Sequence, residues 1–187
     1  MTIKIGLLVG SLASDSINRQ LATALTKLAP AELEIVDIDY SKLALYSHDA
    51  DADYPAEAVE FKAALADVDG LLVVTPEYNR SIPGPLKNAL DWASRPWGQN
   101  VVAGKPSAMI GASIGAIGTA VAQAHLRTVL SFLDSAVMAQ PEGYLTITPG
   151  FFTADGEIAD DSTASFLQSW MQAFAKHIAA HVSVSAN

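Results

Sequence analysis

Small hydroxyl and amide side chains follow directly after the first apolar run of the chain, Ile3 to Val9. The next segment, GSLASDSIN, places Ser11, Ser16 and Asn18 just ahead of a helical pattern that begins near Ile17. Free backbone N–H groups and the positive end of the helix dipole can bind an anion there without a lysine. The segment therefore predicts a site for one terminal phosphate, and the alternative is that Ser16 or Asn18 only caps the helix. The glycine patterns of dinucleotide and NTPase loops are absent.

A second group of functional side chains follows the apolar run Leu71 to Val74. That run is too short for a helix and reads as a strand buried on both faces. The residues TPEYN, at 75–79, then bring a carboxylate, an aromatic ring and an amide to the carboxyl end of the strand. Pro83 and Pro85 favour a helix start immediately afterwards. Ligands of open α/β sheets bind at such strand ends, so we expect this turn to border a ligand.

A third loop, GASIGAIG, follows the expected strand at 106–111 and contains Ser113 within a G-x-S-x-G pattern. This pattern is typical of the nucleophile elbow of serine hydrolases, and Asp134 or Asp155 followed by His177 would complete the order of that triad. A hydrolase that uses Ser113 is therefore an alternative function. Against it, His177 lies inside an amphipathic helical pattern rather than in a loop.

Strand patterns alternate with helical patterns along the whole chain. Strands are expected at 3–9, 33–36, 71–74, 106–111 and 136–139, and the segment 141–161 is expected to be irregular. Parallel neighbours need crossover helices, so we predict one α/β domain over residues 1–187, a doubly wound five-stranded parallel sheet of order 2-1-3-4-5 with helices on both faces. The switch point of this order brings the first two loops into one crevice, with the third loop beside them.

The spacing of apolar residues also predicts which helix faces pack on the sheet. Val59, Ala63 and Ala66 lie at core spacing in the second helix, and the last helix carries a stripe for packing onto the sheet, made of Phe166, Leu167, Trp170, Phe174 and Ile178. In the fourth helix one face carries Val121, His125, Val129 and Leu133, and His125 is expected to be a helix-face or interface residue.

The three loops together resemble the NADPH-dependent FMN reductase family, the flavodoxin-like quinone, chromate and azo reductases. GSLASDSIN is similar to the family loop G-S-x-R-x-x-S-x-N, and TPEYNRSIPGPLKNALDW is similar to its signature T-P-E-Y-N-x-S-x-P-x-x-L-K-N-x-x-D-W. GKPSAMIGASIGAIG resembles the family's G-K-P strand and glycine loop. The resemblance covers about residues 3–143, and its middle motif is the most specific.

This resemblance implies a flavodoxin-like fold, bound FMN, and hydride transfer from NADPH or NADH through FMN to quinones, free flavin or similar acceptors. It implies a homodimer or homotetramer. It also implies three groups of FMN-binding residues: Ser11, Ser16, Ile17 and Asn18 at the phosphate, Pro76, Glu77, Tyr78 and Asn79 at the isoalloxazine ring, and Ser113, Ile114, Gly115 and Gly118 on the other side of the flavin. No catalytic acid or base is expected, because hydride transfer mainly requires stacked rings.

Three residues near the expected flavin site qualify this expectation. The family commonly has an arginine where this chain has Ala13, which leaves the preference between NADPH and NADH open. Two interpretations of Arg80 stay open: it supplies the missing charge from the neighbouring loop, or it is a solvated loop arginine, as exposed arginines usually are. A carboxylate beside a reduced flavin would be repelled, so Glu77 is expected to face a backbone hydrogen-bond network or a partner subunit.

Composition excludes several other functions. The chain has 187 residues, no cysteine and a net charge of −9, with its Lys and Arg residues scattered, which argues against thiolate chemistry, nucleic acids and anionic membranes. No signal peptide or apolar span is apparent, so a soluble cytoplasmic protein without a metal site is expected. The acidity leaves one further alternative, a flavodoxin-type electron carrier for a basic protein partner.

Overall fold

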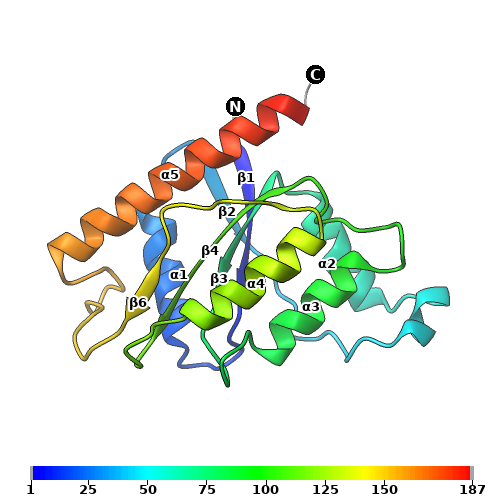
Figure 1. Cartoon of the computed structure of the whole chain (residues 1–187), viewed down its shortest axis with the longest axis horizontal. Helices are drawn as coiled ribbons and strands as arrows, with labels where there is room; N and C mark the ends of the chain where they lie inside the picture. Colours follow the sequence, from blue (N-terminus) through cyan, green and yellow to red (C-terminus); the bar gives the residue numbers. More distant parts are fainter. Residues whose placement is uncertain (1, 186–187) are drawn as a thin grey trace.

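The computed structural model describes residues 2–185 and is built on a central parallel sheet. Its strands are β1 (Ile3–Val9), β2 (Leu33–Asp37), β3 (Gly70–Val74), β4 (Pro106–Ser113), β5 (Ala136–Val137) and β6 (Tyr144–Thr146). The order β2-β1-β3-β4-β5 confirms the predicted topology. All of the pairings are parallel, so the carboxyl ends of the strands lie at one edge, the lower edge in Figure 1.

Strand β6 was not predicted, because its segment was expected to be irregular. It pairs with the carboxyl half of β4, Gly111 to Ser113, whereas β5 pairs with the amino half at Pro106 and Ser107. Two short strands therefore share one side of β4. A three-residue strand is too short for periodicity to reveal it, and the edge that β4 offers is what orders it.

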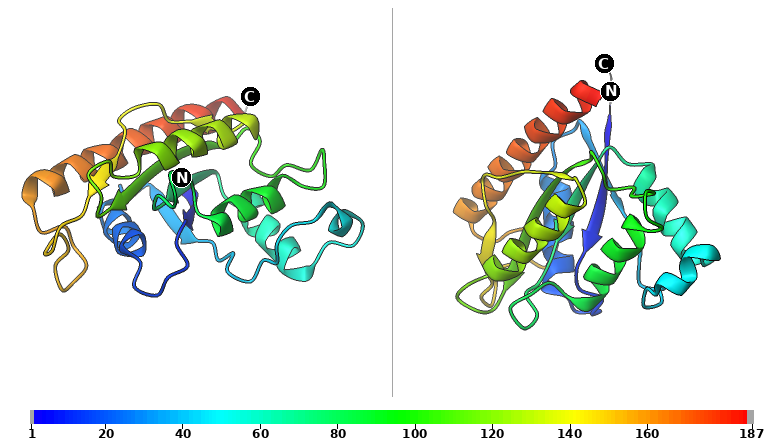
Figure 2. Two further views of the ribbon diagram at one scale, coloured as in Figure 1. Left: turned by 60° about the horizontal axis from the view of Figure 1, so that its bottom comes forward. Right: turned by 45° about the vertical axis from the view of Figure 1, so that its right-hand side comes forward.

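Helices cover both faces of the sheet, as predicted (Figures 1 and 2). One face carries α1 (Ile17–Leu28) and α5 (Asp161–Ser185), and the other carries α2 (Ala56–Ala66), α3 (Gly84–Ser94) and α4 (Ala120–Phe132), with a short 3-10 helix at His48–Ala52. Each layer has its own core. Phe61, Leu86 and Leu126 lie in one, while Leu21 and Trp170 lie in the other.

The predicted core positions of α2 were wrong. In α2, Val59, Ala63 and Ala66 are exposed, and the buried residues are Ala58, Phe61 and Leu65. In α4 the four residues expected on one face differ in burial: Leu133, at the C-cap, is buried, Val121 and Val129 are partly buried, and His125 is exposed. The residues of α4 that face inward are Ala122, Gln123, Leu126 and Leu130. Alanine-rich helices carry a weak periodic signal, so packing against the sheet decides which face is buried.

The inner face of α5 was predicted correctly at Leu167, Trp170, Phe174 and Ile178, which are all fully buried. Phe166 was wrongly placed in this group, since it is 39% exposed. Within residues 2–185 no helix is long and apolar enough to cross a membrane.

Close backbone approach draws the ends of β1, β3 and β4 together at the lower edge. Thr75 follows β3 and is fully buried between Gly10 and Gly111. A Cβ atom at Gly10 would lie 2.4 Å from Thr75 Oγ1, and one at Gly111 would lie 2.1 Å from the Thr75 carbonyl oxygen. These two glycines therefore let the loops that follow three neighbouring strands start side by side.

Candidate functional site

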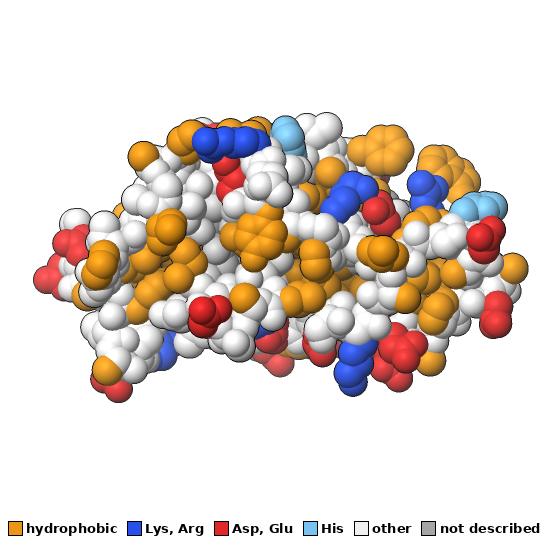
Figure 3. Space-filling model, turned by 90° about the horizontal axis from the view of Figure 1, so that it is seen from below, with side chains coloured by type: hydrophobic (Ala, Val, Ile, Leu, Met, Phe, Trp, Pro, Cys, Tyr) orange, Lys and Arg blue, Asp and Glu red, His pale blue; other side chains and the backbone are white. Residues whose placement is uncertain are grey.

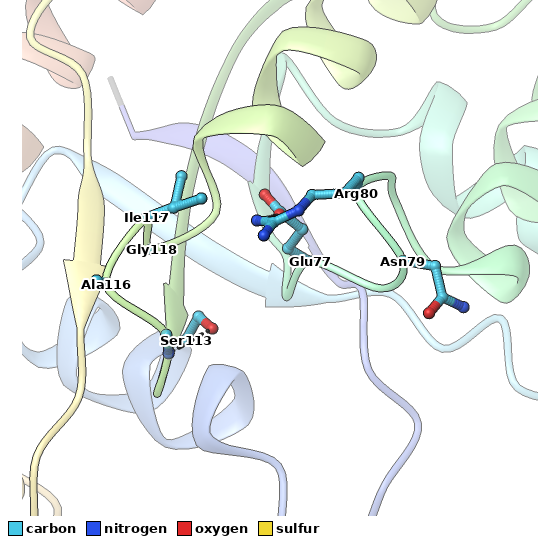
Figure 4. Close-up of a pocket in the computed structure, with 8 residues that line it drawn as sticks. Glu77, Asn79, Arg80, Ser113, Ala116, Ile117 and Gly118 are labelled. Carbon is cyan, nitrogen blue, oxygen red and sulfur yellow. Dashed lines mark hydrogen bonds and ion pairs between the residues drawn. The ribbon is translucent and has the colours of Figure 1, made fainter.

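The loops after β1, β3 and β4 meet at the carboxyl edge of the sheet, as the predicted topology requires. Between the second and third of them lies a cavity of about 320 Å³. Figure 4 shows its lining residues, which are Glu77, Asn79, Arg80, Ser113, Gly115, Ala116, Ile117 and Gly118. Ala116 and Ile117 were missed by the sequence analysis, although their position between two predicted site glycines would have been sufficient to include them.

The first loop presents two buried hydroxyl groups. Ser11 and Ser16 are each 7% exposed. Ser16 is the N-cap of α1, and its Oγ accepts a hydrogen bond of 3.3 Å from the Arg19 amide. Ser11 Oγ accepts from the Ala13 amide and lies 3.4 Å from Tyr78 Oη of the second loop. The capping role of Ser16 is thus present, and it also fixes the helix N-terminus at which an anion would be bound.

Asn18 ties the first loop to the third. Its side chain is 1% exposed and makes two hydrogen bonds of 2.9 Å, one donated to the Ala112 carbonyl and one accepted from the Ala112 amide. This pair of bonds joins the first turn of α1 to the carboxyl end of β4. The predicted contact of Asn18 with phosphate stays a prediction, and the geometry gives this residue a positioning role.

The second loop contains a two-residue turn at Asn79 and Arg80. Tyr78 and Ser81 exchange two backbone hydrogen bonds of 2.9 Å, and φ is 50° at Asn79 and 64° at Arg80. Two positive φ values in a row define a type I′ turn, which normally has glycine at its second position. Arg80 therefore occupies a backbone conformation that is unfavourable for its side chain.

Glu77 joins the second loop to α4. Its side chain is 7% exposed; Oε2 accepts from the Val121 and Ala122 amides at 3.0 and 3.1 Å, and Oε1 accepts from Arg80 Nη1 at 2.9 Å. This confirms the expectation of a backbone network. Burial alone would raise the pKa of Glu77, but the bonds from Ala122 and Arg80 outweigh it and hold the pKa below its ordinary value.

This lowered pKa predicts a dependence of stability on pH. Because the carboxyl pKa is lower in the folded than in the unfolded protein, ionised Glu77 stabilises the fold fully above the unfolded pKa, and this contribution falls as pH drops through the folded pKa. Urea unfolding of the wild type and of Glu77→Gln should therefore show a difference in free energy at pH 7 that shrinks steadily below about pH 4.5. A difference that stays constant down to pH 3 would contradict this role.

The third loop is shaped by its own turns. Ser113 Oγ accepts a bond of 3.1 Å from the Gly115 amide, and Gly118 has a φ of 61° and packs against Tyr144 of β6. Between them Ile114 and Ile117 project outward, 83% and 48% exposed. Strand β6 thus packs against the third loop.

Apolar side chains gather around the site. Leu12 and Tyr78, each 48% exposed, extend from the first and second loops, and Ile114 and Ile117 extend from the third. Figure 3, which views this edge, shows hydrophobic side chains across the middle of the face. An exposed apolar surface beside buried hydroxyl groups suits a ligand with a flat ring and an anionic tail.

The serine hydrolase alternative does not fit the structure. His177 Nε2 lies 2.7 Å from the carbonyl oxygen of Ala136, which pairs with Pro106 at the amino end of β4. Ser113 is the last residue of this eight-residue strand, roughly 23 Å away at the strand rise of 3.3 Å. Asp134 lies at the same far edge, where its carbonyl accepts a hydrogen bond from the Gly104 amide, so no triad forms.

Among residues 2–185 no group of acidic and histidine side chains could hold a metal ion.

The chain is similar to known proteins in both sequence and fold. A family model described as NADPH-dependent FMN reductase matches residues 3–149. The 2-hydroxy-1,4-benzoquinone reductase of a Burkholderia species is 54% identical over 175 residues, covering 94% of this chain and 96% of that protein, and a quinone reductase of Pseudomonas putida is 42% identical over 93% and 94%.

Among solved structures, FerB, a flavoenzyme NAD(P)H:(acceptor) oxidoreductase from Paracoccus denitrificans, superposes with a TM-score of 0.92. It is 42% identical, and the match covers 96% of this chain and 99% of that one. The chain belongs to the NADPH-dependent FMN reductase family.

Proposed function

We propose that this protein is an FMN-dependent NAD(P)H oxidoreductase that reduces quinones, free flavin or similar diffusible acceptors. The observation that carries the proposal lies at the switch point of the sheet. There a loop with buried hydroxyl groups at the N-terminus of α1 lies beside an exposed apolar surface. The names of the relatives point to the same activity, and that of the Burkholderia protein points to hydroxylated benzoquinones among the acceptors.

The residues present fit FMN. Ser11, Ser16 and the first-turn amides of α1, including that of Ile17, would hold the phosphate, with Asn18 fixing their position. The ring would lie between Pro76 to Asn79 on one side and the 113–118 loop on the other. Bound FMN would accept two electrons from NAD(P)H and deliver them to an acceptor. The chain's part is to orient both partners and to leave one ring face open, which requires no acid or base.

We further propose a domain organisation, a location and an assembly for the protein. Residues 1–187 form one domain, the protein works in the cytoplasm, and it assembles as a homodimer or homotetramer. The assembly is supported by large apolar side chains that the single chain leaves exposed, among them Leu45 at 87% and Trp97 at 77%. Sedimentation measurements would test the assembly directly.

The test of the function is a visible spectrum of the protein after loading with FMN and desalting, repeated anaerobically with NADPH and with NADH. We expect a retained flavin band that one or both nucleotides bleach, and quinone addition should restore it. A retained band that neither nucleotide bleaches would favour the electron carrier instead. Failure to retain flavin would contradict the proposal.

The same experiment addresses the nucleotide preference. Ala13 is exposed and provides no charge in the first loop, where the family commonly has an arginine. Comparison of the bleaching rates with NADPH and NADH shows whether the protein distinguishes the two without that arginine.

A further inference from the structure

Arg80 occupies a place in the chain where an arginine is costly. It is the second residue of the type I′ turn, with a φ of 64°, and glycine is the residue that this position favours. A non-glycine residue held in the left-handed region is strained and commonly marks a functional constraint. The ion pair with Glu77 offsets part of this cost and also fixes the direction of the guanidinium.

The guanidinium faces the cavity. In Figure 4 the side chain of Arg80 extends from the turn toward Glu77 and the third loop, whereas Asn79 points away. The side chain is 65% exposed. Glu77 engages Nη1, and because the guanidinium carries five N–H donors in one plane, donors remain for a ligand in the cavity.

The charge of Arg80 is not cancelled by Glu77. Of the residues that line the cavity, these two alone have charged side chains. The carboxylate of Glu77 also accepts from two amides at the N-terminus of α4, where the helix dipole offsets its charge further. Arg80 therefore places a cationic group beside the proposed position of the FMN ring, within reach of an acceptor stacked on the open face of that ring, in a protein whose net charge is −9.

We propose that Arg80 selects quinones that are anionic, namely those with an ionised hydroxyl group on the carbon beside a carbonyl. The inference rests on the proposed function and adds the substrate's charge state to it. A 2-hydroxy-1,4-quinone is a vinylogous carboxylic acid and is ionised at neutral pH. Its ionised oxygen and the adjacent carbonyl oxygen can both accept hydrogen bonds from the N–H groups of one guanidinium.

The location favours the acceptor over the phosphates of NADPH. The phosphate that distinguishes NADPH from NADH lies on the adenosine ribose, separated from the nicotinamide ring by a pyrophosphate and two sugars. Arg80 instead lines the same cavity as Ile117, one of the apolar side chains against which a reacting ring would pack. A group on the ring itself is therefore within its reach.

The reaction also benefits from this selection. A hydroxyquinone anion takes a hydride equivalent derived from NAD(P)H and two protons from water, giving NAD(P)⁺ and a neutral benzenetriol. The product phenol is a much weaker acid than the substrate. Arg80 therefore binds the ionised substrate better than the neutral product, which favours product release.

The test compares two quinones on the FMN-loaded protein reduced with NADH under anaerobic conditions. The quinones are 2-hydroxy-1,4-benzoquinone and its uncharged analogue 2-methoxy-1,4-benzoquinone, and the measured quantity is the second-order rate constant for flavin reoxidation. Arg80→Gly, which suits the positive φ of the turn, should lose about tenfold to a hundredfold with the hydroxyquinone and little with the methoxyquinone. Arg80→Lys, which keeps the charge, should retain most of the wild-type selectivity.

Controls separate this inference from general effects. Lys176→Gln removes one positive charge from the exposed side of α5 and should change neither rate constant. Equal losses for both quinones in Arg80→Gly, or no loss for either, would overturn the inference. A loss confined to reduction by NADPH would also overturn it, because Arg80 would then serve the nucleotide. If wild-type protein is not bleached by either nucleotide, the proposed function itself fails.

Discussion

Replacing Gly111 with alanine is expected to lower the free energy of unfolding by about 3 kcal/mol or more, since overpacking of a rigid site is costly. The added Cβ would lie 2.1 Å from the Thr75 carbonyl oxygen and 2.5 Å from Thr119 Oγ1. The carbonyl belongs to backbone that is held next to β4 by the bond from the Thr75 amide to the Ile110 carbonyl. Removing this steric overlap therefore requires β3 and β4 to separate at the edge where their loops form the site.

Urea unfolding and FMN retention after desalting would measure both effects of Gly111→Ala. The matched control is Gly84→Ala, at the start of α3, where an added Cβ would meet nothing within 4 Å. This control should leave stability unchanged or raise it by up to about 1 kcal/mol, because alanine favours helix. If Gly111→Ala proved as stable as Gly84→Ala, the close approach of these strands would not exist in the protein.

Asn18→Ala is expected to lower the free energy of unfolding by about 2 to 4 kcal/mol, because two buried polar groups lose their partners. The amide and the carbonyl of Ala112, a fully buried residue, would both be left without the Asn18 side chain. The first turn of α1 and the third loop would also lose their connection. FMN retention should therefore fall together with stability.

The matched control is Asn88→Ala. Asn88 likewise accepts from one backbone amide, that of Tyr46, and donates to one carbonyl, that of Ala44, but its site is more open to water. Water can replace these hydrogen bonds, so Asn88→Ala should lower the free energy of unfolding by less than Asn18→Ala does. If Asn18→Ala weakened FMN binding without changing the unfolding curve, Asn18 would be a direct phosphate ligand, and its positioning role would be rejected.

The sequence by itself determined the topology of the sheet and which three loops lie at its carboxyl edge. Apolar runs such as Leu71 to Val74 specify buried parallel strands, and their alternation with helical patterns leaves few possible sheet orders. The residues that follow each run must then lie at the carboxyl edge. For this reason all three loops could be identified before their contacts were known, even though the binding role of each residue stays a prediction.

Only the tertiary structure decided which groups meet across long separations in the chain. Asn18 bonds to Ala112, 94 residues away, and Glu77 bonds to the first amides of α4. His177 follows Ser113 in the order that a hydrolase triad requires, but the two residues lie at opposite edges of the sheet. The buried faces of α2 and α4 and the existence of β6 depend equally on the sheet. Local patterns record how a segment folds, whereas these features arise from surfaces that form only when the sheet is assembled.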